Sequence, residues 1–244
     1  MNQEDDIRYI ITRGNIRTLL QPIFVLSSGH IIGYEALARG PHDSQLEMPA
    51  AMFAAAESAD VLSELEHLCR QSALRAKAQL LRPRELLFVN IDPRVPNPSD
   101  LTPDAPGWRP DTVVLELTER VADLSRLKTA LAQWRRLGYR IAIDDVGSGY
   151  SGLLTLAEIR PQFIKLDMSI IRGIDKDAVR AALVRAMTQF AREVGAYVVA
   201  EGIEAARELA TLQKLGVDYG QGFYLGRPQE KPLAHSRLRL LASP

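Results

Sequence analysis

Seven short apolar runs in this sequence end on a polar residue of a type that binds metal ions or moves protons. A buried strand does not need a charged residue at its end, so packing alone does not explain the repetition. If the runs are parallel strands of one barrel, their ends meet at a single rim. The residues at these ends are Glu35, Asn90, Glu116, Asp144 with Asp145, Lys165, Glu201 and Gln221.

Five carboxylates on one rim would repel one another, and Lys165 supplies only one positive charge. Divalent cations with oxygen ligands would neutralise the excess, and Asn90 adds a neutral oxygen. None of the four histidines ends a strand, which disfavours zinc. The pattern therefore predicts Mg²⁺ or Mn²⁺. The adjacent pair Asp144 and Asp145 could bridge two such ions, an arrangement that activates water against a phosphoester.

Side chains alternate along a strand, so residues two apart share a face. This rule groups Glu35 with Leu37 and Arg39. In the run VLELT it leaves Leu115 and Leu117 facing the outer helices. Each strand is thus expected to have one apolar face and one face that carries a functional group near its C-terminal end.

The elements that must position these residues are eight strands that alternate with helices, which predicts an α/β fold and most simply a closed (β/α)8 barrel. The four residues SSGH join the first two strands and are too few for a crossover helix, so these strands should be antiparallel. The expected strands are 19–26, 30–38, 86–91, 113–118, 139–144, 163–166, 197–201 and 218–224.

Helical periodicity predicts two helices in 50–81 and further helices at 121–137, 152–159, 176–194 and 204–214. A short helix is expected at about 4–17. The proline-rich stretch 82–110 could be a domain linker, but the strands on either side are too few to stand alone. We therefore interpret residues 1–244 as one domain, with the barrel from about residue 18 to residue 244.

Composition limits the classes of partner. The 30 basic and 30 acidic residues cancel, which argues against a nucleic-acid polymer as ligand. Cys69 is the only cysteine, so no intrachain disulfide can form and a reducing compartment is expected. The acidic N-terminus does not resemble a signal peptide, and no apolar run reaches the length of a membrane span. We expect a cytoplasmic protein without membrane insertion.

The ordered motifs resemble those of the EAL domain, the cyclic-di-GMP phosphodiesterase family. The resemblance extends from QPI at 21–23 to QGFYLGRP at 221–228 and includes EALAR (35–39), VNID (89–92), ELTE (116–119), DDVGSGYSG (144–152), KLD (165–167) and AEGIE (200–204). It implies a modified, TIM-like eight-stranded barrel with an antiparallel first strand. It also implies hydrolysis of cyclic di-GMP to linear pGpG with Mg²⁺ or Mn²⁺, two ions per site.

The resemblance implies a role for each matching residue. One metal would be held by Glu35, Asn90, Glu116 and Asp144, and the second by Asp144, Asp145 and Glu201. Lys165 would orient or activate the attacking water, Gln221 would support the site, and Glu119 would anchor the loop after the Asp-Asp pair. Gln21, Leu37 and Arg39 would contact the ligand, with Arg39 on a phosphate.

Three residues depart from the family pattern in the loop that couples the metal site to the dimer interface: Val146, Ser148 and Gly152. They concern the rigidity and regulation of that loop and leave the ligand set intact. By analogy with the family, a homodimer is expected, and a sensor or cyclase domain could belong to a longer parent protein.

Two other functions compete with an active phosphodiesterase. One is a receptor domain that binds cyclic di-GMP without cutting it, although such members usually lack a metal ligand and none is missing here. The other is an enolase-like one-metal enzyme, in which Lys165 would abstract a proton beside Asp167. Enzymes of that kind normally carry a capping domain, for which this chain has no room.

Overall fold

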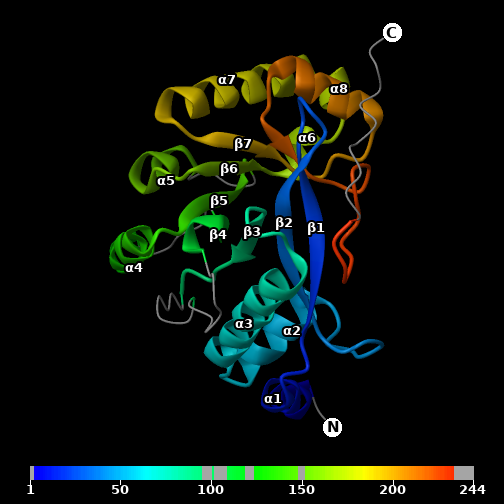
Figure 1. Ribbon diagram of the computed structural model, residues 1–244, viewed down its shortest axis with the longest axis vertical. Helices are drawn as coiled ribbons and strands as arrows, with labels where there is room; N and C mark the ends of the chain where they lie inside the picture. Colours follow the sequence, from blue (N-terminus) through cyan, green and yellow to red (C-terminus); the bar gives the residue numbers. More distant parts are fainter. Residues whose placement is uncertain (1–2, 95–100, 102–108, 119–123, 148–151, 234–244) are drawn as a thin grey trace.

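The computed structural model describes residues 3–94, 101, 109–118, 124–147 and 152–233. Eight strands form a closed barrel in sequence order, as predicted (Figure 1). The strands are β1 (Arg17–Val25), β2 (Ile31–Arg39), β3 (Leu86–Asn90), β4 (Val113–Thr118), β5 (Arg140–Val146), β6 (Phe163–Leu166), β7 (Tyr197–Ala200) and β8 (Tyr219–Gly220).

The first strand runs against both of its neighbours. β1 pairs with β2 and with β8 in antiparallel fashion, whereas every other neighbouring pair is parallel. The short connection after Val25 leaves no space for a helix, so the chain must turn back directly. The register places Gln21 opposite Glu35. The predicted barrel with an antiparallel first strand is confirmed.

Helices cover the outside of the barrel and one of its ends. In Figure 1, α1, α2 and α3 lie together at the bottom, α7 and α8 lie at the top, and α4 and α5 lie along one side. The helices are α1 (Gln3–Arg13), α2 (Pro49–Ser58), α3 (Leu62–Leu80), α4 (Leu124–Leu137), α5 (Gly152–Ile159), α6 (Met168–Ile171), α7 (Ala178–Val194) and α8 (Ala206–Leu215), with 3₁₀ turns at Pro110–Thr112 and Ile174–Lys176.

Because side chains alternate along the strands, the buried apolar residues form two layers, one between strands and helices and one inside the barrel. Leu115 and Leu117 belong to the large core between strands and helices, as predicted. Val114 belongs instead to a smaller cluster inside the barrel, together with Phe88 and Phe163. The two phenylalanine rings meet edge to face at 5.1 Å between their centroids. The barrel interior is therefore filled with side chains.

Two elements are shorter than the periodicity predicts. The first helix ends at Arg13, because Gly14 takes a left-handed φ of 63° and the chain turns into β1. The last strand, predicted at 218–224, contains only Tyr219 and Gly220. At Gly222 a side-chain carbon would come within 2.2 Å of the Ile203 backbone, so the chain leaves the sheet to pass closely over that segment.

Candidate active site

Lys165 lies near the end of β6, on the same strand face as Phe163, and is completely buried. Its ammonium nitrogen is surrounded by four carboxylates, so one cation is shared by four acids. The distances from Lys165 Nζ are 2.6 Å to Glu116 Oε1, 2.8 Å to Glu201 Oε1, 3.1 Å to Asp144 Oδ1 and 3.4 Å to Glu35 Oε2.

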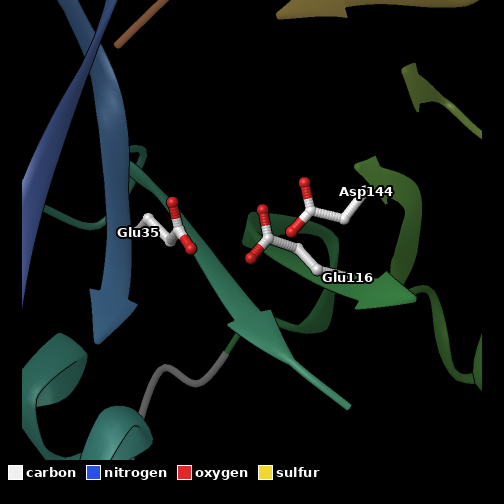
Figure 2. Close-up of side chains that lie close together, drawn as sticks. All are labelled: Glu35, Glu116 and Asp144. Atoms are coloured by element: carbon white, nitrogen blue, oxygen red, sulfur yellow. The ribbon is translucent and has the colours of Figure 1, made fainter. Parts of the chain in front are cut away.

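The carboxylates come from separate strands of the parallel part of the barrel. Glu35 lies on β2, Glu116 on β4 and Asp144 on β5. Figure 2 shows these three side chains directed toward a common space. One oxygen from each lies within 4.8 Å of the others. A second group with the same spacing contains Asp144, Asp145 and Glu201, so Asp144 belongs to both groups.

A β-bulge explains how two consecutive residues, Asp144 and Asp145, both reach this site. Neighbouring residues of a regular strand point to opposite faces. Here the register between β5 and β6 shifts between Ile143 and Val146, and Asp145 takes a left-handed φ of 58°. Its backbone N–H donates a hydrogen bond of 2.9 Å to Asp144 Oδ1. The bulge therefore places both carboxylates at the same site.

Two amide side chains fix the orientation of the acids. Gln221 Nε2 donates to Glu35 Oε2 at 2.6 Å and to Glu201 Oε1 at 2.8 Å. Asn90 Nδ2 donates to Glu35 Oε1 at 3.3 Å. Gln221 thus connects a carboxylate of the first group to a carboxylate of the second. Both residues were predicted for this rim, and the structure places them within it.

Burial and mutual repulsion shift the proton affinities of the cluster. Burial, reinforced by Glu35, raises the pKa of Glu116 well above its ordinary value. Burial also raises the pKa of Glu201 to about 8. Burial alone would lower the pKa of Lys165, but the surrounding carboxylates together raise it well above its ordinary value. The raised pKa values of the two glutamates reflect more acidic groups than one lysine can offset, and divalent cations with oxygen ligands would supply the missing positive charge.

A cavity of about 720 Å³ adjoins the acidic cluster, and Asn90 lines it. Leu37 and Arg39, both predicted to contact a ligand, also line this cavity. Gln21, predicted for the same role, is buried and donates to the Gly226 carbonyl at 3.3 Å. Burial lowers the pKa of Arg39, and the positive charge of nearby Arg17 lowers it further.

Sequence reasoning missed a buried ion pair in the wall of this cavity. Glu66 and Arg70 lie one turn apart on α3, and Arg70 Nη1 donates to Glu66 Oε2 at 2.9 Å. Two opposite charges four residues apart usually lie on the solvated face of a helix, so the spacing of this pair does not mark it as buried. Arg94 closes the opposite side through contacts with Asp92 at 2.6 Å and Glu57 at 2.7 Å.

The remaining predicted positions lie at or beyond the limits of the described chain. Glu119 and Ser148 fall outside the described residues. Val146 is buried at the end of β5, and Gly152 is the first residue of α5.

A closed eight-stranded barrel with one reversed strand and an acidic rim defines the class of protein. Residues 4–228 match the EAL domain, and this chain belongs to that family. The uncharacterized protein y4lL of Sinorhizobium fredii is 32% identical over 97% of this chain and 30% of its own length. The chain covers less than half the length of several curated relatives that it matches.

Solved structures agree with this assignment. The phosphodiesterase of Pseudomonas aeruginosa MucR, in complex with c-di-GMP, is 27% identical and superposes with a TM-score of 0.81 over 94% of this chain and 98% of that one. Klebsiella pneumoniae BlrP1, in a manganese and c-di-GMP complex, is 30% identical with a TM-score of 0.80, covering 88% of this chain and 56% of its own.

Among the helices of the described residues, none combines the length and the apolar character needed to cross a bilayer.

Proposed function

We propose that this chain is a phosphodiesterase that hydrolyses cyclic di-GMP to linear pGpG with the help of Mg²⁺ or Mn²⁺. One observation carries the proposal: carboxylates on three strands and just after a fourth converge around the buried ammonium group of Lys165. A MucR phosphodiesterase domain with the same fold was solved with c-di-GMP, which supports the choice of substrate.

Two metal ions would share the acidic cluster. Glu35, Asn90, Glu116 and Asp144 would hold one ion, and Asp144, Asp145 and Glu201 would hold the other. The two groups of oxygens, joined at Asp144, support this division. Bound ions would supply the positive charge that activates water and stabilises negative charge on the phosphate. Relatives solved with manganese or calcium support a divalent cation.

The chain's own residues would orient the reacting groups. Lys165, buried among these acids, would hold the attacking water in place through hydrogen bonds. Glu201, 2.8 Å from that ammonium group, would accept a proton from the water. Gln221 would keep Glu35 and Glu201 in place through its two hydrogen bonds. Glu119 would anchor the loop that follows the Asp-Asp pair.

The adjoining cavity would hold one half of the dinucleotide. Arg39 lines the cavity two residues beyond Leu37 and would bind a phosphate. Gln21 and Leu37 would make further contacts with the ligand. The volume of about 720 Å³ lies in the range of small-molecule sites.

The test is a hydrolysis assay with cyclic di-GMP and either Mg²⁺ or Mn²⁺, in which pGpG is separated by chromatography. Glu201→Gln should reduce turnover by about 100-fold or more, because it removes both a metal ligand and a proton acceptor. The matched control is Glu193→Gln, an exposed residue of α7, which should retain full activity. Binding of cyclic di-GMP by the wild type without pGpG formation would show a receptor and refute the enzyme.

We also propose that residues 1–244 act as a single catalytic domain that forms a homodimer. Its relatives are longer than this chain, and MucR is named a bifunctional diguanylate cyclase/cyclic di-GMP phosphodiesterase. A sensor or cyclase domain could therefore regulate this domain within a longer protein.

A further inference from the structure

A second cavity, of about 990 Å³, lies at the end of the barrel opposite the acidic cluster. The first residues of four strands line it: Ile31 of β2, Leu86 of β3, Arg140 of β5 and Tyr219 of β8. The acidic residues, in contrast, lie toward the other ends of the strands. The rest of the wall comes from the start of β2 and from the segment 82–85. We call it the lower cavity because it lies at the N-terminal ends of the parallel strands, whatever the orientation of Figure 1. It plays no part in the proposed hydrolysis.

Three guanidinium groups line the lower cavity, and none of them forms an ion pair among the described residues. None of Arg82, Arg84 and Arg140 uses its side chain in a hydrogen bond or ion pair with any residue that the structure describes. Arg140 stands two residues before Ala142, which lies inside the barrel, so its side chain points to the inner face. Arg109 and, more weakly, the charge of Arg140 lower the pKa of Asp111, so an acid lies within electrostatic reach of Arg140, but no described carboxylate pairs with it directly.

The acids near this cavity are already engaged. Glu85 is the only acid in its lining, and its Oε2 accepts a hydrogen bond of 2.8 Å from the backbone N–H of Arg82. Asp111 pairs with Arg109 at 2.7 Å. Asp218 accepts from the backbone N–H of Val198 at 3.0 Å. A hydrogen bond from a backbone N–H leaves a carboxylate charged, but the described lining holds three arginines against one glutamate, so the lower cavity presents an excess of positive charge.

Aromatic rings form part of the same end of the barrel. Tyr219 lines the cavity and packs against Tyr197 with 5.4 Å between ring centroids. Phe163 lies behind both rings, at 6.1 Å from Tyr219 and 5.8 Å from Tyr197. The Tyr197 ring is 46% exposed, so the stack has an accessible edge. A planar group could stack there while its phosphates reach the arginines.

We propose that the lower cavity binds a small ligand that combines phosphate groups with a planar ring, of the nucleoside diphosphate class. Arginine forks match phosphate oxygens in pairs, and a low net charge for the whole chain favours a compact anion over a nucleic-acid polymer. The volume also suits one small molecule.

The experiment measures GDP binding by isothermal titration calorimetry in EDTA, which keeps divalent ions from the acidic rim. Arg140→Ala should weaken GDP binding by about tenfold or more, because it removes a charge-assisted pair of hydrogen bonds. The matched control, Arg185→Ala, changes an exposed arginine of α7 that also lacks a described partner and should bind GDP like the wild type. Failure of the wild type to bind GDP at millimolar concentration would overturn the proposal.

Two further variants keep the test decisive. Arg84 lies on an exposed segment, so Arg84→Ala should not disturb the fold. This variant should weaken GDP binding even if Arg140→Ala is unstable. Tyr219→Leu should weaken GDP binding but leave the binding of inorganic pyrophosphate unchanged, because pyrophosphate has no ring to stack. If GDP binds equally well to the wild type, Arg84→Ala and Arg140→Ala, the ligand lies elsewhere and the proposal is wrong.

Discussion

The ammonium group of Lys165 lies 2.6 Å from the carboxylate of Glu116, and both side chains are completely enclosed by protein. Glu116 could not be buried in charged form without this lysine, because an isolated charge is strongly destabilised away from water. The pair stands at the centre of the acidic cluster. Its charge balance therefore governs both the stability of the barrel and the affinity of the rim for cations.

Replacing this lysine should destabilise the protein when divalent ions are absent. Lys165→Met leaves the surrounding carboxylates without a counterion, and breaking a buried pair costs roughly 3–5 kcal/mol. Mg²⁺ should restore part of the loss by neutralising the same acids. Thermal unfolding in EDTA and in Mg²⁺ measures both effects. Lys128→Met, which breaks an exposed pair with Glu158, is the control and should change stability little. Equal melting temperatures for both variants in EDTA would contradict this account.

Asp145 should show opposite effects on stability and activity. Asparagine tolerates the left-handed conformation as well as aspartate does, so Asp145→Asn should keep or slightly raise the melting temperature. The loss of a carboxylate from the second group of oxygens should reduce hydrolysis by about 100-fold. Asp60→Asn, at another left-handed aspartate that is exposed between α2 and α3, serves as the control for both measurements. Retention of activity in Asp145→Asn would favour a one-metal enzyme.

The number of bound ions should depend on which acid is replaced. Titration with Mn²⁺ should give about two ions per wild-type chain. Glu116→Gln should lose one ion and retain the other, because Glu116 belongs to only one of the two groups of oxygens. Asp144→Asn should weaken both sites, because Asp144 belongs to both. An Asp144→Asn variant that binds Mn²⁺ like the wild type would show that the division is incorrect.

Glu66 should make stability depend on pH in the weakly acidic range. Burial raises its pKa from 4.5 to about 7 in the folded protein. The unfolded chain releases this proton first as the pH rises, so the free energy of unfolding should fall between about pH 4.5 and pH 7. In Glu66→Gln the free energy of unfolding should fall less over this pH range than in the wild type. Urea unfolding at several pH values between 4.5 and 7 measures the difference. Glu64→Gln, an exposed glutamate on the same helix, should follow the wild type.

The sequence predicted the barrel and most of the acidic rim for a physical reason. A strand with one buried face has a period of two, so a polar residue such as Lys165 at the end of an apolar run is visible without coordinates. The roles of Gln21 and Arg39 came from the resemblance to the family. Neither follows from periodicity, because nothing local distinguishes these side chains from ordinary surface residues.

Features that depend on contacts between distant segments could not be predicted in this way. The bulge at Asp145 depends on pairing with β6, which no local pattern encodes. The buried pair of Glu66 and Arg70 has the spacing of an exposed helix face. The lower cavity requires closure of the barrel, because it brings Arg84 and Arg140 to the same end from distant parts of the chain.

The bulge in β5 also has a consequence for protein engineering. A designer who transplanted the letters Asp-Asp onto a regular strand would direct one carboxylate into the apolar layer beneath the helices. The functional unit to transplant is the irregular strand with its partner β6, including the extra residue and the left-handed backbone at Asp145. Homology-guided grafts that preserve residue identities but regularise the backbone should therefore yield folded barrels in which only one of the two carboxylates reaches the rim.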